Sequence, residues 1–147
     1  MADHAYELIV QSTPENVWKA LTDSDLTEQY YFGSRYETDW KVGSSYRALD
    51  HEGNVSGEGE ILAAEENSVL RTTFKPLWLE GGEPSTLSWE LTPLSDLTLI
   101  KLTQSDIDDE TFEAAQMHIG WVYILSSLKS LLETGKALPV PEIFAAS

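Results

Sequence analysis

The sequence predicts an α+β fold in which a strongly bent antiparallel sheet packs against one long helix near the C-terminus. The segment 111–135 places apolar residues at alternating spacings of four and three, which is typical of a helix with one broad apolar face. Between residues 45 and 105, apolar residues mostly alternate with polar ones, and the turns are short, as in an antiparallel meander. A sheet with one apolar face needs cover, and the long helix is the largest predicted element that can provide it.

Length, composition and charge narrow the class of protein. With 147 residues and an apolar fraction of 41%, we expect one packed domain over residues 1–147. Lys and Arg number 9 and Asp and Glu 25, and the formal charge of −16 argues against nucleic acid, anionic membranes and highly phosphorylated ligands. Without cysteine there is no disulfide or zinc–thiolate site. No signal peptide or apolar run of ~20 residues is visible, so we expect a cytoplasmic protein without a membrane partner.

The N-terminal part is predicted to form a strand, two short helices and a short strand. Two caps are possible for the first helix. Either Thr13 is the N-cap and Pro14 takes the first helical position, or Ser12 is the N-cap and Glu15 completes a capping box. The strands are expected at residues 4–11 and 36–40, and the second helix at 23–30.

The middle of the chain reads as a run of strands, expected at residues 45–50, 55–65, 69–75, 85–92 and 97–105, with a loop at 76–84. Gly57 and Gly59 fall inside one strand, which indicates a bulge, a sharp bend or the close approach of another element. The alternating residues Glu58, Glu60 and Glu90 are expected on the outer face of the sheet, with a cavity mouth as the alternative.

The long predicted helix has marked ends. The acidic run 106–110 precedes or opens it, where carboxylates favour the positive end of the helix dipole. Gly135 is expected to be a left-handed C-cap. Because Phe112, Ile119 and Val122 lie off the main apolar stripe, we expect the first half of the helix to be covered on more than one side.

An ordered set of segments along nearly the whole chain resembles the START-like (SRPBCC) superfamily, which has the helix-grip fold. These segments are residues 12–21, 30–33, 39–44, 87–91, 118–121 and 128–136. Within the superfamily, the chain is most similar to homologues of the C-terminal domain of the activator of the heat-shock chaperone ATPase. The resemblance implies a hydrophobic cavity between the sheet and the long helix, and a superfamily that includes lipid and sterol carriers, polyketide cyclases and hormone receptors.

Aromatic residues are the main candidates for a site, because Tyr and Trp offer a broad apolar face and one polar group. The main alternative for each is core packing. His118 could hydrogen-bond a ligand or act as a general base, or it could be a packed histidine with a local partner. The predicted ligand-binding residues are Tyr30, Tyr31, Phe32, Phe74, Trp89, Met117, His118, Trp121 and Leu125, with Tyr30 and His118 as polar anchors.

The leading hypothesis is the binding of a small hydrophobic or aromatic molecule, lipid-like or polyketide-like, without a cofactor. One alternative is a cyclase or dehydratase that uses His118. Another is a chaperone-activator-like module, with a protein partner or a homodimer. We predict no metal site, because His4, His51 and His118 are far apart in the sequence and the run 106–110 lacks the glycine and closing glutamate of a calcium loop.

Overall fold

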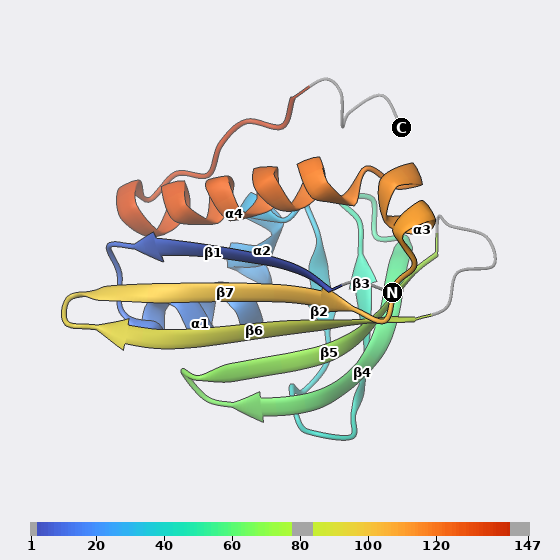
Figure 1. Cartoon of the computed structure of the whole chain (residues 1–147), viewed down its shortest axis with the longest axis horizontal. Helices are drawn as coiled ribbons and strands as arrows, with labels where there is room; N and C mark the ends of the chain where they lie inside the picture. Colours follow the sequence, from blue (N-terminus) through green and yellow to red (C-terminus); the bar gives the residue numbers. More distant parts are fainter. Residues whose placement is uncertain (1–2, 78–83, 142–147) are drawn as a thin grey trace.

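The computed structural model describes residues 3–77 and 84–141. It contains seven strands, two short helices after the first strand, and two helices near the C-terminus (Figure 1). The elements are β1 (His4–Val10), α1 (Pro14–Thr22), α2 (Ser24–Tyr30), β2 (Arg35–Glu37), β3 (Ser45–Leu49), β4 (Val55–Glu65), β5 (Val69–Pro76), β6 (Ser85–Leu94), β7 (Leu97–Ser105), α3 (Asp109–Ala114) and α4 (Met117–Thr134).

The strands form one antiparallel sheet in the order β1-β7-β6-β5-β4-β3-β2. Consecutive strands from β2 to β7 are neighbours, which confirms the predicted meander. β1 pairs with β7, the last strand. The segment with the helices α1 and α2 therefore connects β1 at one edge of the sheet to β2 at the other edge. The sheet is strongly curved, and α4 lies along its β1 side (Figure 1).

The core lies between the inner face of the sheet and the helices. The buried cluster includes Val17 from α1, Trp89 from β6, Ile100 from β7 and Leu128 from α4. The predicted alternation holds on β6, where Leu87, Trp89 and Leu91 are buried. Glu58, Glu60 and Glu90 are all exposed, which confirms their expected place on the outer side.

Local signals explain several element ends. Thr13 is the N-cap of α1, its hydroxyl accepts a hydrogen bond from the Asn16 N–H at 3.2 Å, and Pro14 opens the helix, so the capping box from Ser12 is wrong. Gly135 ends α4 with φ 83° and donates its N–H to the Leu131 carbonyl, as predicted.

Gly59 allows the close approach that its place in a strand indicated. A Cβ at this position would overlap the carbonyl oxygen of Thr73 on β5 and would lie 2.6 Å from the ring of Tyr46 on β3. The register of the β4–β5 pair also shifts between Ile61 and Ala63. Glycine is therefore required where Tyr46 lies flat across the bent strand.

The predicted helix 111–135 is two helices rather than one. Gln116 has φ 54°, a left-handed conformation, and it separates α3 from α4. Asp108, within the acidic run, caps α3 and accepts a hydrogen bond from the Thr111 N–H. The expected cover on several sides of the first half is also wrong, because Ile119 and Val122 are exposed. Phe112 is buried, but it belongs to α3.

The strand β1 lies at an edge of the sheet, and α4 covers the end of its free side. Lys129 Nζ donates to the carbonyl oxygen of Ile9 at 2.7 Å, and Glu133 accepts from the backbone N–H of Gln11 at 2.8 Å. The two side chains also pair with each other, with Nζ and Oε2 2.8 Å apart. This end of β1 is therefore held against the helix by side chain to backbone contacts.

Within the described residues, no helix is both long and apolar enough to cross a membrane.

Candidate ligand-binding site

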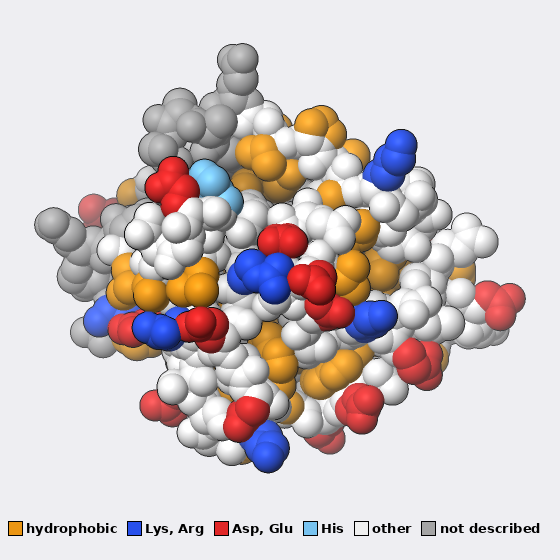
Figure 2. Space-filling model, turned by 180° about the vertical axis from the view of Figure 1, so that it is seen from behind, with side chains coloured by type: hydrophobic (Ala, Val, Ile, Leu, Met, Phe, Trp, Pro, Cys, Tyr) orange, Lys and Arg blue, Asp and Glu red, His pale blue; other side chains and the backbone are white. Residues whose placement is uncertain are grey.

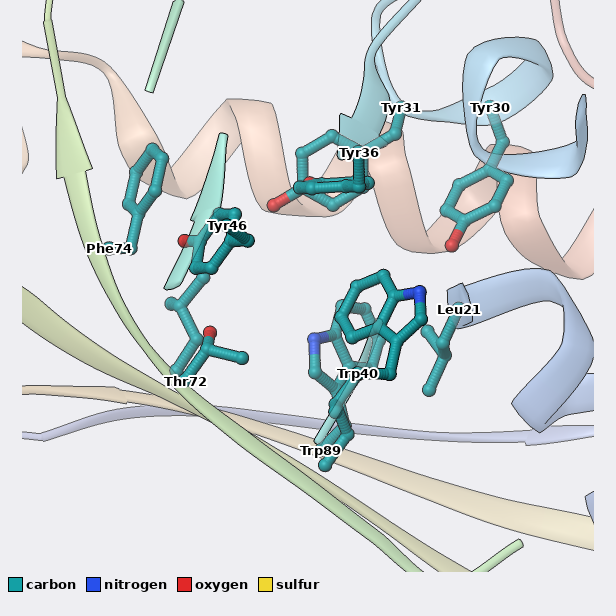
Figure 3. Close-up of a pocket in the computed structure, with 11 residues that line it drawn as sticks. Leu21, Tyr30, Tyr31, Tyr36, Trp40, Tyr46, Thr72, Phe74 and Trp89 are labelled. Atoms are coloured by element: carbon teal, nitrogen blue, oxygen red, sulfur yellow. The ribbon is translucent and has the colours of Figure 1, made fainter. Parts of the chain in front are cut away.

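A small cavity lies inside the curve of the sheet, under α1, α2 and β2. Its free volume is about 30 Å³, and it is partly open to solvent. Figure 3 shows Tyr31 and Tyr36 on one side of the gap and Trp40 and Trp89 on the other. The cavity is lined by Leu21, Tyr30, Tyr31, Tyr36, Trp40, Tyr46, Leu70, Thr72, Phe74, Leu87 and Trp89.

The lining side chains differ in exposure. Tyr31, Tyr36, Trp40 and Phe74 are partly exposed, whereas the others, including Trp89, are buried. The partly exposed rings therefore form the mouth of the cavity, and the strands β5 and β6 supply its floor.

Backbone acceptors hold part of this aromatic shell in place. Tyr30 donates its hydroxyl to the Ala20 carbonyl at 2.7 Å, and Trp40 donates its indole N–H to the Thr22 carbonyl at 2.9 Å. Tyr46 donates to the Thr73 carbonyl at 2.7 Å. Because each of these polar groups has its own partner in the protein, these side chains offer a ligand mainly their apolar faces.

The hydroxyl groups of Tyr31 and Tyr36 are different, because neither donates to a backbone carbonyl within the described residues, and the two rings pack edge-on with centroids 5.9 Å apart. Burial raises the pKa of both tyrosines well above the usual value. The same is true of Tyr46, whose pKa burial also raises. The cavity therefore contains neutral phenols at any physiological pH, and no carboxylate, imidazole, ammonium or guanidinium is among its described lining.

The structure brings some of the predicted site residues together and separates others from them. Tyr30, Tyr31, Phe74 and Trp89 line the cavity. The remaining ones, Phe32, Met117, His118, Trp121 and Leu125, do not. The cavity therefore faces α1, α2 and β2. We expected a cavity against the long helix, but no residue of α4 is among the described lining.

Trp121 and Leu125 lie behind the lining, because both are buried in the core. The indole N–H of Trp121 donates to Gln104 Oε1 at 2.8 Å, and its ring packs edge-on against Tyr31 and Trp89, with centroids 6.0 and 6.3 Å away. Trp121 thus packs against two lining residues, Tyr31 and Trp89, without lining the cavity itself. Met117 is partly buried against the core, and Phe32 stacks on Tyr123 with centroids 5.0 Å apart.

His118 is exposed at the start of α4, and its Nδ1 lies 2.9 Å from the hydroxyl of Tyr6 on β1. The local partner agrees with the alternative of a packed histidine, but the side chain is exposed and not packed in the core. His4 stacks on Phe112 with centroids 3.5 Å apart, and its Nε2 is 3.4 Å from a carboxylate oxygen of Asp109. His51 is exposed in the turn before β4. In the ranges 3–77 and 84–141, no three His, Asp or Glu side chains are grouped to hold a metal ion.

Sequence reasoning missed several lining residues: Leu21, Tyr36, Trp40, Tyr46, Leu70, Thr72 and Leu87. A signal was present for two of them, because Leu70 and Thr72 share a strand face with Phe74. For Trp40 there was none, because it reaches the cavity from a loop residue with φ 59°. Trp78, which falls in the predicted loop 76–84, lies outside the described residues.

A second hollow lies on the surface, between α2 and the turn that connects β3 to β4. Arg35 on its wall is already paired with Asp25 and Glu28, each 3.0 Å away. The cation of Arg35 is thus neutralised by two carboxylates, which disfavours anion binding in this hollow.

On the face opposite to that of Figure 1, acidic and basic side chains lie close together around apolar patches (Figure 2).

The curved sheet, the long C-terminal helix and the two helices between the sheet edges define the helix-grip fold of the START-like (SRPBCC) superfamily. Residues 11–133 match the sequence model of the family described as "Activator of Hsp90 ATPase homolog 1-like protein". This match covers most of the chain, which therefore belongs to that family.

Solved structures share this fold. The chain is similar to the Aha1 dimer of Colwellia psychrerythraea, with 21% identity and a TM-score of 0.77 over 93% of this chain and 100% of that one. It is also similar to an HSP90 activator from Plasmodium falciparum, with 22% identity and a TM-score of 0.73 over 90% of this chain and 96% of that one.

A third similar structure is DynU16, a protein of the dynemicin biosynthetic locus, with 24% identity and a TM-score of 0.78 over 92% of this chain and 48% of that one. Among curated proteins, no sequence matches the chain. At these identities, the structural likeness establishes the fold and not a ligand or partner.

Proposed function

We propose that this protein binds a small, neutral, hydrophobic or aromatic molecule in the cavity under α1, α2 and β2, and that it does so in the cytoplasm. The observation that carries the proposal is the lining itself. It is formed by aromatic and aliphatic side chains and carries a few inward polar groups, a composition typical of small-molecule sites.

The size of the cavity sets a condition on binding. A cavity that accepts benzene measures roughly 150 Å³, whereas the free volume here is about 30 Å³. A ring can enter only if side chains at the mouth move. Phe74 is suited to this, because its side chain is only partly buried.

The expected affinity follows from the area that a ligand would bury. About 300 Å² of apolar area would contribute roughly 7 kcal/mol before the entropy of association and the displacement of side chains are subtracted. Binding at micromolar or weaker concentrations is therefore expected for a ligand with few polar contacts.

The test is a titration with 1-naphthol followed by tryptophan fluorescence, since Trp40 and Trp89 line the cavity. A saturable change is expected in the natural protein. Thr72→Met places a larger side chain on the buried floor and should weaken binding at least tenfold. Leu62→Met, on the exposed side of β4, is the matched control and should bind as the natural protein does. Equal binding by the natural protein and Thr72→Met, with both folded, would contradict the proposed site.

The geometry favours binding over catalysis. The cyclase or dehydratase alternative assigned an acid–base role to His118, and that side chain is exposed and lies outside the described lining. No other group in this lining exchanges protons near neutral pH, because burial raises the pKa values of its tyrosines.

A second candidate function is protein binding or homodimerisation. The observation that favours it is an exposed apolar strip on the outer side of α4, where Ile119 and Val122 are exposed and the following segment carries exposed Leu138 and Val140. Leu138 is fixed to α4 by hydrogen bonds to Ser127 and Tyr123. Two similar structures are an Aha1 dimer and an HSP90 activator. Light scattering on the natural protein and on Val122→Lys tests this candidate, and a natural protein that stays monomeric and captures no chaperone would oppose it.

A further inference from the structure

The lining of the cavity includes an indole N–H without a hydrogen-bond partner in the described part of the chain. Trp89 is buried, and its indole N–H has no acceptor among the described residues. His4 Nε2 is the only described polar side-chain atom that is fully buried without a hydrogen bond, so the Trp89 N–H is not fully enclosed by the protein. By contrast, the indole N–H groups of Trp40 and Trp121 both have acceptors.

The two phenols at the mouth add a second donor. The rings of Tyr31 and Tyr36 pack edge-on with centroids 5.9 Å apart, and neither hydroxyl donates to a backbone carbonyl among the described residues. Of the two hydroxyl protons, at most one can be used within the pair, so at least one is available to a ligand. In Figure 3 the indole nitrogen of Trp89 and the tyrosine pair face the same gap from opposite sides.

The charge of a fitting ligand group follows from the same residues. An anion would meet no cationic side chain in the described lining, and the protein carries a formal charge of −16. An ammonium or guanidinium group would bring further donors and would meet no carboxylate in the described lining. A neutral acceptor, with lone pairs and no proton of its own, fits both donors.

The free volume also matches this group. A free volume of about 30 Å³ is more than the roughly 10–15 Å³ that one water molecule needs, so it can also hold a carbonyl oxygen. The oxygen fits the free volume of the cavity, while the apolar body of the ligand occupies the mouth after Phe74 has moved.

We infer that the ligand is a neutral ketone or aldehyde with an aromatic body, whose carbonyl oxygen accepts hydrogen bonds from Trp89 Nε1 and from one hydroxyl of the Tyr31 and Tyr36 pair. This inference rests on the proposed function and specifies its ligand class. Leaving buried donors without an acceptor is costly, so a hydrocarbon of the same shape binds more weakly at this site.

The experiment compares acetophenone with α-methylstyrene, which replaces the carbonyl oxygen with a methylene group and keeps the shape. Affinities are measured by NMR titration of ¹⁵N-labelled protein. We expect acetophenone to bind about tenfold more tightly than α-methylstyrene. The indole N–H resonance of Trp89, assigned through Trp89→Phe, should shift downfield with acetophenone only.

Variants assign the preference to the donors. In Tyr31→Phe/Tyr36→Phe the ratio of the two affinities should fall at least threefold. Tyr30→Phe is the matched control, because Tyr30 lines the same cavity but donates its hydroxyl to Ala20, so the ratio should persist. Thermal unfolding checks that each variant is folded.

The outcomes separate this inference from the proposed function. If both compounds bind equally to the natural protein, or if the double variant keeps the full ratio, the carbonyl inference is overturned and the proposed function stands. If neither compound binds and 1-naphthol also fails, the proposed function itself is overturned.

Discussion

The hydrogen bond between Trp121 and Gln104 gives the sharpest prediction about stability. Gln104 on β7 is fully buried, its Oε1 accepts from Trp121 Nε1 at 2.8 Å, and its Nε2 donates to Ser85 Oγ at 3.1 Å. One amide thus connects α4, β7 and β6. We expect Gln104→Met, which keeps the length of the side chain, to leave the Trp121 N–H buried without an acceptor.

The magnitude follows from counting the groups that lose a partner. Ser85 also has the Phe74 carbonyl as an acceptor, at 3.4 Å, so the main loss is the indole N–H. An unsatisfied buried donor costs about 1–3 kcal/mol, so the free energy of unfolding should fall by about 2 kcal/mol. For a domain of this size, that lowers the Tm by roughly 4–8 °C.

The assay is urea unfolding followed by far-UV circular dichroism, because tryptophan fluorescence changes when Trp121 is replaced. In Trp121→Phe the acceptor on Gln104 loses its donor instead. In the double variant, neither the indole N–H nor the amide oxygen remains to lack a partner. Its loss in the free energy of unfolding should therefore be smaller than the sum of the two single losses by about 1–3 kcal/mol. Gln29→Met, at an exposed position on α2, is the control and should change stability by less than about 0.5 kcal/mol. Losses that add within about 0.5 kcal/mol would refute the reasoning.

Three further predictions concern local structure. Gly59→Ala should destabilise the protein by at least about 2 kcal/mol in urea unfolding, because its Cβ overlaps the Thr73 carbonyl oxygen; unchanged stability would show that β4 and β5 separate easily. Gly120→Ala should instead stabilise it by up to about 1 kcal/mol, since this helical position has no atom within 4 Å of the added Cβ, and a loss would contradict that open space. The pKa of Asp108 is lowered by hydrogen bonds from Thr111, first from its backbone N–H and then from its hydroxyl. As the pH falls, the carboxylate of Asp108 is therefore protonated in the unfolded state before it is protonated in the folded state. The stability that Asp108 contributes is present above its usual pKa and is lost below about pH 4. Asp108→Asn should therefore lose less stability than the natural protein between pH 5 and pH 2, measured by urea unfolding, and parallel curves would remove Asp108 from this account.

The fold could be predicted largely from local patterns. Alternation of apolar and polar residues located β4 and β7 with their observed bounds, Val55–Glu65 and Leu97–Ser105. For the N-cap of α1 the sequence left two candidates, Ser12 and Thr13, and the structure shows that Thr13 is the cap and that Pro14 opens the helix. These features depend on neighbours in the sequence, which is why the sequence contains them.

The break between α3 and α4 could not be predicted, because the apolar spacing continues across it. Neither Gly nor Pro stands at the break, and Gln116 adopts φ 54° without a sequence signal. The strain there is balanced by tertiary packing of Phe112 on one side and Trp121 on the other, both of them buried.

The position of the cavity depends on pairs of residues distant in the sequence. Trp121 was a reasonable candidate for the lining, because it lies on the apolar face of α4. Its hydrogen bond to Gln104 holds it in the core and away from the cavity, and no pattern in the sequence indicates that the polar side chain of Gln104 is buried. Likewise, Trp40 reaches the lining because its indole N–H finds the Thr22 carbonyl. Such long-range choices decide which aromatic rings pack in the core and which border free space.

The contacts of Lys129 and Glu133 with the backbone of β1 also bear on self-association. An open sheet has two borders, and a bare border is a template on which a strand from another molecule can add. Here one border is β2, which is only three residues long, and on the other the Ile9 carbonyl and the Gln11 amide are already occupied by side chains from α4. This end of β1 therefore offers neither of these groups to a strand from another molecule, and replacing both Lys129 and Glu133 by alanine would free them for such pairing.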